Sequence, residues 1–224
     1  MEEYSVFDII GPVMVGPSSS HTAGAARIGR IARNILGSEP NKVQILLHGS
    51  FAATYKGHGT DRALVGGILG MEPHDPSIRE ALRIAWKKGI ELVIQTGSLG
   101  DVHPNTARIS LESASGERVE VVGTSVGGGL VKIIQIDGFT LEMSGEYTTL
   151  VAVYDDRPGM VATVSGVLAQ YQVNIAFMRV SRRSSDRKTL MVVETDQSIP
   201  TEAVHLIEDS IELDRVKVIA KSAI

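Results

Sequence analysis

Two kinds of hydrophobic pattern meet near residue 146. Before it, apolar residues recur at helical spacing over 18–36 and again over 78–85, with a glycine-rich helical stretch up to residue 71 between them. Alternation of apolar and polar residues over 107–113 is typical of a half-buried antiparallel strand. The expected strands are 42–48, 91–96, 107–113, 118–124, 129–137 and 139–143. The pattern therefore predicts an α+β domain over residues 1–146, with helices early and a meander late.

The remaining residues, 147–224, follow a more regular order. An apolar strand is followed by a helix whose apolar residues share one face, then by two strands, a second helix and a last strand. The expected bounds of the elements other than the first helix are 148–155, 173–183, 188–196, 200–209 and 215–221. This β-α-β-β-α-β order predicts a ferredoxin-like domain, in which two helices back a four-stranded antiparallel sheet.

Composition excludes several classes of protein. The 224 residues allow one or two domains, and a net charge of −4 argues against general nucleic-acid binding. No apolar run approaches the roughly 18 residues of a membrane span, and the first residues lack the basic region of a signal peptide. Because cysteine is absent, this chain alone has no disulfide, zinc-thiolate site or iron–sulfur cluster. We expect a soluble, cytoplasmic protein.

The string D-R-P-G at the start of the expected helix, and V-N-I at the start of the next strand, resemble an ACT domain, a small module that binds amino acids. The resemblance implies an effector site made by Asp156, Pro158, Gly159, Asn174 and Ile175. Free N–H groups at a helix N-terminus suit a carboxylate, and an asparagine amide can meet an ammonium group. In the family such sites commonly form where two ACT domains pair. Alternatively, proline and glycine only make the strand-to-helix turn, because fold alone does not determine function.

Three polar strings mark the first part of the chain. They are G-P-S-S-S-H-T-A-G-A-A-R-I-G at 16–29, H-G-S-F-A-A-T-Y-K-G-H-G-T-D-R at 48–62, and H-P-N-T at 103–106. In the first string, hydroxyl side chains precede a helix whose first turns are small, which suits a carboxylate ligand. His21 can carry protons near neutral pH. The alternative is that Ser18 is an ordinary helix cap and its neighbours are redundant.

Together the three strings resemble the β subunit of bacterial iron–sulfur-dependent L-serine dehydratases. The resemblance implies conversion of L-serine to pyruvate and ammonia, with a [4Fe–4S] cluster held by a separate, cysteine-bearing α subunit and no metal ligand on this chain. The implied catalytic candidates are His21, Ser19, Ser20, Thr22 and His58. The implied substrate-binding candidates are Ser18, Ser50, Lys56, Asp61, His103 and Asn105. Which group is the base stays open.

Two other functions compete with this interpretation. The first is a non-catalytic regulatory protein that binds an amino acid through its ACT domain; it leaves the polar string at 18–22 without a role. The second, a metal hydrolase, lacks carboxylates at ligand spacing from the histidines. Whichever function holds, the edge strand of the second domain favours side-by-side pairing. We therefore expect a homodimer contact through residues 147–224.

Overall fold

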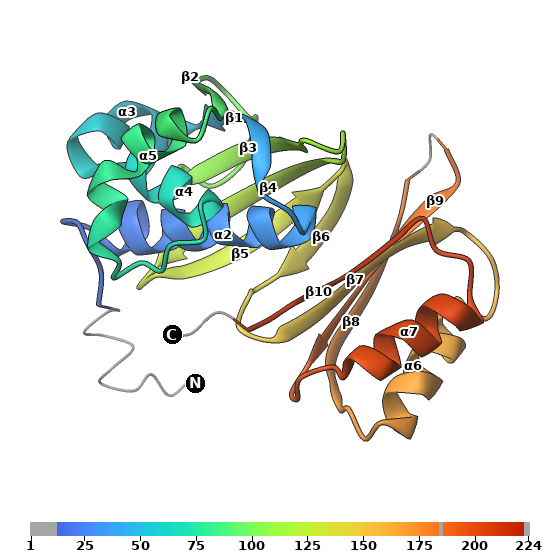
Figure 1. The fold of residues 1–224 in the computed structure, drawn as a ribbon. Coiled ribbons are helices and arrows are strands. Elements are labelled where there is room, and N and C mark those ends of the chain that lie inside the picture. The colour runs from blue at the N-terminus through green and yellow to red at the C-terminus, as the bar shows by residue number, and fades with distance from the viewer. Residues whose placement is uncertain (1–12, 184–185, 222–224) are drawn as a thin grey trace. The chain divides into compact units, whose positions relative to one another are not determined.

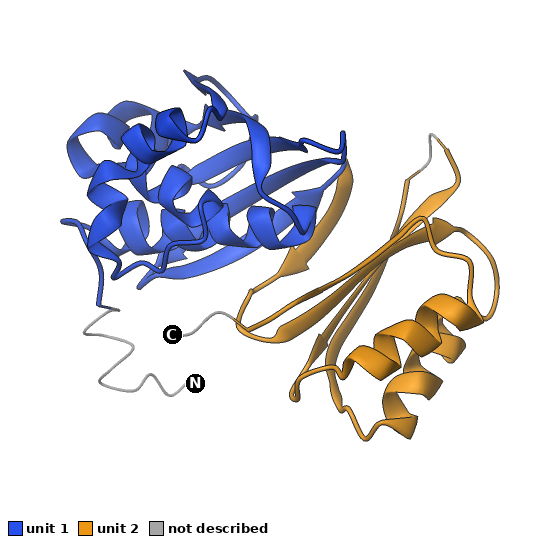
Figure 2. Ribbon diagram, viewed as in Figure 1, with its two compact units in different colours: residues 1–137, 224 blue, residues 138–223 orange. Residues whose placement is uncertain are grey.

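The computed structural model describes residues 13–183 and 186–221, which belong to two compact units that divide between Asp137 and Gly138 (Figure 2). The sequence pattern placed the change of domain later, at Tyr147. Residues 138–146 lie in the second unit, where the Ser181 hydroxyl donates to the Thr140 carbonyl oxygen at 2.6 Å. The boundary at Tyr147 between independently folding domains stays a prediction.

The first unit is a sheet with helices against it (Figure 1). Its strands lie in the order β2-β1-β3-β4-β5, with β1 and β2 parallel and the other neighbours antiparallel. The strands are β1 (Pro40–Leu47), β2 (Glu91–Thr96), β3 (Thr106–Ser113), β4 (Arg118–Gly127) and β5 (Leu130–Ile136). The helical elements are η1 (Ser19–Gly24), α2 (Ala25–Leu36), α3 (Gly49–His58), α4 (Thr60–Ile68), η2 (Pro76–Glu80) and α5 (Ala81–Lys87).

Small residues let the two central helices of this unit approach closely. A Cβ atom on Gly29 of α2 would overlap the Leu64 carbonyl oxygen of α4, and one on Gly67 of α4 would overlap the Ala26 carbonyl oxygen of α2. Larger side chains at these positions would separate the two helices. On its other side, α2 packs on β3 and β4, so it forms the middle layer of the core.

The second unit has the expected β-α-β-β-α-β order, preceded by one short strand (Figure 1). Its sheet has the order β10-β7-β9-β8, every pair antiparallel, and α6 and α7 bury a core of aliphatic side chains against it. The elements are β6 (Phe139–Met143), β7 (Thr148–Asp155), α6 (Met160–Gln170), β8 (Ile175–Arg182), β9 (Lys188–Thr195), α7 (Thr201–Ser210) and β10 (Arg215–Ile219).

The structure adds detail to two expected helical segments. The glycine-rich helical stretch consists of two helices, because Gly59 has a φ of +71° and ends α3 before α4 begins. The helix expected to open at Pro158 begins at Met160, after Gly159 with a φ of +92°. Among residues 13–183 and 186–221, no helix is both long and apolar enough to cross a membrane.

Candidate functional site

The first polar string forms a wide helical turn. Ser19–Gly24 is π-helical and continues into α2, and the Ser18 hydroxyl accepts a hydrogen bond from the His21 backbone N–H at 3.3 Å. Ser18 is therefore the N-cap that the sequence predicted. Single π-helical turns concentrate at functional sites, since they displace side chains from ordinary helical positions. Here the turn buries His21, which is 8% exposed.

Both ring nitrogens of His21 meet serine hydroxyls. Its Nδ1 lies 3.0 Å from the Ser20 Oγ and 3.3 Å from the Ser18 Oγ, and its Nε2 lies 3.0 Å from the Ser50 Oγ. A neutral imidazole donates from one nitrogen and accepts at the other, whereas a hydroxyl does both. The first and second polar strings thus form one hydrogen-bonded cluster, which we call the His21 cluster: Ser18, Ser20, His21 and Ser50.

Burial keeps the His21 ring in its neutral form. Desolvation is the main cause that lowers its pKa below 6.5, and the neighbouring His58 lowers it further. The two imidazoles meet edge to face with centroids 4.8 Å apart, and the buried Phe51 ring meets His21 similarly at 5.2 Å. At neutral pH the His21 ring therefore retains a lone pair that can accept a proton.

The third polar string supports the start of α3. The His48 N–H donates to the Thr106 carbonyl oxygen at 3.0 Å, and the Phe51 N–H donates to the Pro104 carbonyl oxygen at 3.3 Å. Gly49 has a φ of +54°, and a Cβ atom there would lie 2.7 Å from Pro104. A glycine is therefore needed where this loop meets the helix that carries Ser50.

His103 and Asn105 contribute to this loop in another way. The His103 Nδ1 accepts a hydrogen bond from the Asn105 N–H at 3.1 Å, and the His103 ring is exposed. The Asn105 carbonyl oxygen accepts from the Ser125 N–H of β4 at 2.9 Å. The backbone of the third string thus contacts the second string. Among the described residues no hydrogen bond or ring contact joins the His103 or Asn105 side chain to His21.

Several buried polar atoms around the turn have no hydrogen-bond partner among the described residues. They are the Thr22 Oγ1, the His58 Nδ1, the Thr60 Oγ1 and the Ser125 Oγ. They belong to η1 itself or to α3, α4 and β4, each of which contacts η1. Buried polar atoms are normally paired, so such a group concentrated around one turn is typical of a binding site.

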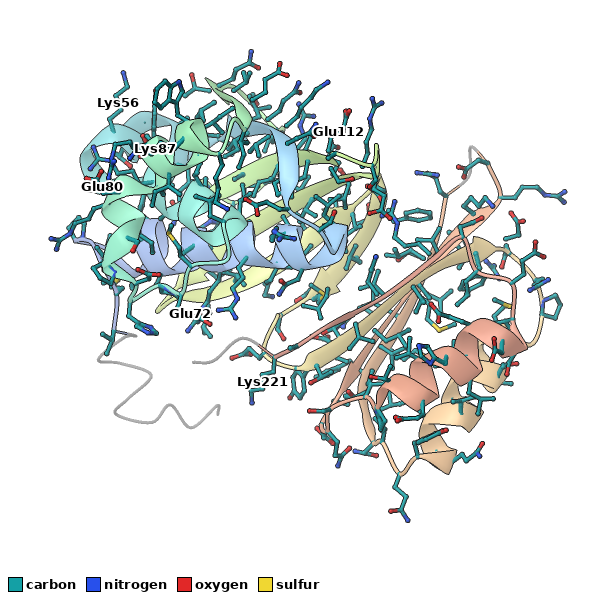
Figure 3. The ribbon with its side chains drawn as sticks, viewed as in Figure 1. Lys56, Glu72, Glu80, Lys87, Glu112 and Lys221 are labelled. Carbon is teal, nitrogen blue, oxygen red and sulfur yellow. The ribbon has the colours of Figure 1, made fainter. Side chains whose placement is uncertain are left out.

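Three other predicted residues lie outside the His21 cluster. Lys56 is exposed, its ammonium 5.7 Å from the centre of the Tyr55 ring, and Figure 3 shows it pointing away from the helices. Asp61 is buried, and its carboxylate accepts from the Arg62 N–H at 2.8 Å. The Ser19 side chain is partly buried at the first position of η1.

The sequence analysis gave no role to two residues of this site. Phe51 contacts the His21 ring, and the Ser125 hydroxyl occupies the space that a Cβ atom on Gly24 would need. Ser125 carried a usable signal, because it lies two residues before three consecutive glycines. Phe51 has none, since an apolar ring is an ordinary core residue. Thr60 belongs to the second polar string, and its hydroxyl is buried without a hydrogen-bond partner among the described residues.

In the second unit, the structure separates the predicted effector residues into two groups. Asp156, Pro158 and Gly159 line an open pocket of about 450 Å³, which Tyr154, Met160 and Arg182 also line. Asn174 and Ile175 follow the other end of α6, whose 11 residues span about 16 Å. There the Asn174 amide donates to the Asp196 carboxylate at 2.6 Å. A single chain therefore does not bring the two groups together.

Iron–sulfur clusters are held by cysteine thiolates, and the sequence has no cysteine. Across residues 13–183 and 186–221, no three histidine, aspartate or glutamate side chains gather as a metal site would require.

Each unit of the chain matches a known protein family. Residues 5–85 match the family described as "Serine dehydratase beta chain", and residues 147–212 match the ACT domain family. The "Probable L-serine dehydratase, beta chain" of Bacillus subtilis is 44% identical over 100% of both chains. The "L-serine dehydratase, beta chain" of Peptoniphilus asaccharolyticus is 43% identical over 89% of this chain and 90% of that protein.

A more distant relative shows that both units recur elsewhere. The "D-3-phosphoglycerate dehydrogenase" of Methanocaldococcus jannaschii is 26% identical over 87% of this chain but only 37% of that protein. The two dehydratase beta chains are 43–44% identical to this chain over at least 89% of both sequences. The chain therefore belongs to the family of L-serine dehydratase beta chains, with an ACT domain as its second part.

Proposed function

We propose that this chain is the substrate-holding subunit of an enzyme that converts L-serine to pyruvate and ammonia. The observation that carries the proposal is the His21 cluster, in which a buried neutral imidazole is held between serine hydroxyls from two segments of the chain. The names of the two relatives similar over most of their length support the same reaction.

In this proposal the hydroxyl groups hold the substrate carboxylate. Ser18, Ser20 and Thr22 all lie on the π-helical turn or at its cap, and the Thr22 hydroxyl is buried without a partner among the described residues. A carboxylate offers several acceptor positions, so it can take hydrogen bonds from more than one of these hydroxyls.

His21 is the group of this chain that accepts the α proton of serine. Its lowered pKa keeps it unprotonated at neutral pH, and Ser50 holds the ring in place through Nε2. His58 lies edge to face with the His21 ring and contributes to lowering its pKa, after desolvation as the main cause.

We propose that the [4Fe–4S] cluster expected for such an enzyme is held by a separate, cysteine-bearing α subunit. The reason is the donor set: cluster irons take thiolate ligands, and this chain has no cysteine. Without its partner the chain is therefore expected to be colourless and inactive. Its cytoplasmic location stays a prediction.

The test is serine turnover by the reconstituted pair of subunits. The chain is combined anaerobically with the cysteine-bearing subunit, and pyruvate is measured for the wild type, His21→Ala and the control His74→Ala, whose side chain is exposed. We expect activity only with both subunits, and a loss of about 10²- to 10⁴-fold in His21→Ala, the usual contribution of a general base. Full turnover by an assembled His21→Ala complex would contradict the assignment.

A second candidate function concerns the ACT domain. The pocket lined by Asp156, Pro158 and Gly159 favours binding of an amino acid there, and Asn174 of a second copy would complete the site in a homodimer. Calorimetry with L-serine on the His21→Ala chain separates this site from the first one. Binding lost in both Asp156→Ala and Asn174→Ala supports the effector site, and binding unchanged in both contradicts it. A protein that binds serine in this way, yet forms no pyruvate in the assembled pair, would be a sensor rather than an enzyme.

A further inference from the structure

An exposed tryptophan lies among basic residues on the helical side of the first unit. Trp86 of α5 is 78% exposed, whereas most large apolar side chains of this unit are buried. We call the surface around it the Trp86 face. It consists of Arg79, Arg83, Trp86 and Lys87, which follow the three- and four-residue spacing of one helix face, and of Arg62, which lies close to Glu80 of the same segment; all five are exposed. Tryptophan and arginine are the residue types most enriched at protein interfaces, because they combine a large contact area with hydrogen-bond donors.

The Trp86 face is positively charged, in contrast to the whole chain with its net charge of −4. Among described residues its four cations make one ion pair, that of Arg83 with Glu80 at 2.5 Å. Arg62 and Lys87 also lie close enough to Glu80 to lower the pKa of its carboxyl group, after Arg83 as the main cause. Figure 3 shows Lys87 and Glu80 near one another. Four cations therefore face one carboxylate, and among the described residues three positive charges remain uncompensated on this surface.

The face begins at the edge of the candidate site. Arg62 follows Thr60 and Asp61 at the start of α4, four residues after His58. The adjoining α5 packs on α4 and carries Trp86. A protein that approaches His58 from outside therefore meets the Trp86 face next to it.

We propose that the Trp86 face docks the cysteine-bearing subunit through an acidic surface of that subunit, an inference that rests on the proposed function. A partner that brings an iron–sulfur cluster close to His21 must cover the surface around His58. The charge of the face selects an acidic partner surface. A second copy of this chain is the weaker occupant, because a two-fold contact through this face would place its positive charges opposite one another.

The single tryptophan of the chain makes the proposal directly measurable. The chain is produced with 5-fluorotryptophan, so that the fluorine resonance reports Trp86 alone, and is titrated anaerobically with the unlabelled cysteine-bearing subunit. Affinity is measured in parallel by sedimentation for the wild type, Trp86→Ala and Lys87→Glu. The control variants are Phe177→Ala, an exposed aromatic residue of the second unit, and Lys221→Glu, an exposed lysine of that unit.

We expect the fluorine resonance to shift as the complex forms, and Trp86→Ala to weaken the complex about 30-fold, the effect of removing a central interface residue. Lys87→Glu is expected to weaken it too, with a smaller dependence on salt than the wild type, and both controls to bind as the wild type does. Because Trp86 is exposed, its removal leaves the fold intact, which a thermal unfolding curve verifies.

Three results would overturn the proposal. The first is a complex that forms with an unshifted resonance and equal affinity in all variants; serine turnover by that complex would still support the proposed function. The second is a resonance that shifts with the concentration of this chain alone, which assigns the face to a second copy. The third is no complex at all, which also removes the proposed function. Conversely, docking at Trp86 without pyruvate formation would contradict the function and leave the docking surface standing.

Discussion

Replacing Ser50 by alanine tests whether the His21 cluster acts as a unit. The substitution removes the one hydroxyl that meets the His21 Nε2, at 3.0 Å, and leaves the contacts of Nδ1 with Ser18 and Ser20 in place. His21 is only 8% exposed, so water replaces the lost hydroxyl poorly. Two consequences of different size follow, one on stability and one on turnover.

The stability cost comes from an imidazole nitrogen left without its partner. An unsatisfied buried polar group costs about 1–3 kcal/mol, and we expect the lower half of that range because His21 retains a small exposed fraction. The catalytic cost comes from the freedom that the ring gains. Misplacement of a catalytic group by about 1 Å costs about 10²-fold in rate, so kcat should fall by that order.

The assay uses the assembled pair of subunits for kcat and KM, and urea unfolding of this chain for stability. Ser165→Ala is the matched control, since its hydroxyl is exposed on α6 and bonds only the Ala162 carbonyl oxygen at 3.2 Å. If Ser50→Ala left both kcat and the free energy of unfolding at the control values, the hydrogen bond to Nε2 would carry neither effect, and the reasoning would be refuted.

Four further predictions rest on three features: the lowered pKa of His21, the backbone at Gly49 and the buried Glu194 carboxylate. Burial holds the pKa of His21 below 6.5, so between that pH and the folded pKa the unfolded chain binds more protons than the folded chain. The free energy of unfolding should therefore fall as the pH decreases from 6.5 towards the folded pKa. His21→Asn should lose this dependence in urea titrations at several pH values. The same pKa should appear as an acidic limb in the pH profile of kcat/KM, with its midpoint below pH 6.5. Gly49→Ala should destabilise the first unit by about 1 kcal/mol or more, because Gly49 has a positive φ and an added Cβ atom would overlap Pro104. Thermal unfolding measures the effect. The control is Gly57→Ala, where space is open and an unchanged or higher midpoint is expected. In the second unit Glu194 is 2% exposed, and its carboxylate accepts hydrogen bonds from the Ser144 N–H and hydroxyl. Glu194→Ala should therefore lower the free energy of unfolding by about 2 kcal/mol, measured by calorimetry. An unchanged unfolding midpoint would contradict that role.

Local pattern was enough for most of the secondary structure. The alternation in β3, the apolar face of α6 and the serine cap before residue 21 depend on residues within a few positions of one another. Period-2 and period-3.6 spacing respond to burial on one side of a strand or helix, and the order of the resulting elements limits the fold. The break at Gly59 was not visible in the same way, because a glycine within a helical pattern either continues the helix or ends it, depending on tertiary packing.

The sequence by itself determined the type of chemistry that this chain can offer: hydroxyls and an imidazole near a helix start, and no thiolate for a cluster. Only the tertiary structure decided which of these groups meet. Ser50 reaches His21 across 29 residues of chain, the Phe51 ring buries the imidazole, and Asn174 lies at the far end of α6 from Gly159. Hydrogen bonds and desolvation act over a few ångströms, whereas the spacing of residues along a chain does not set their distance in space. The pKa of His21 and the exposure of Trp86 are therefore properties of the packed fold, which the sequence pattern did not specify.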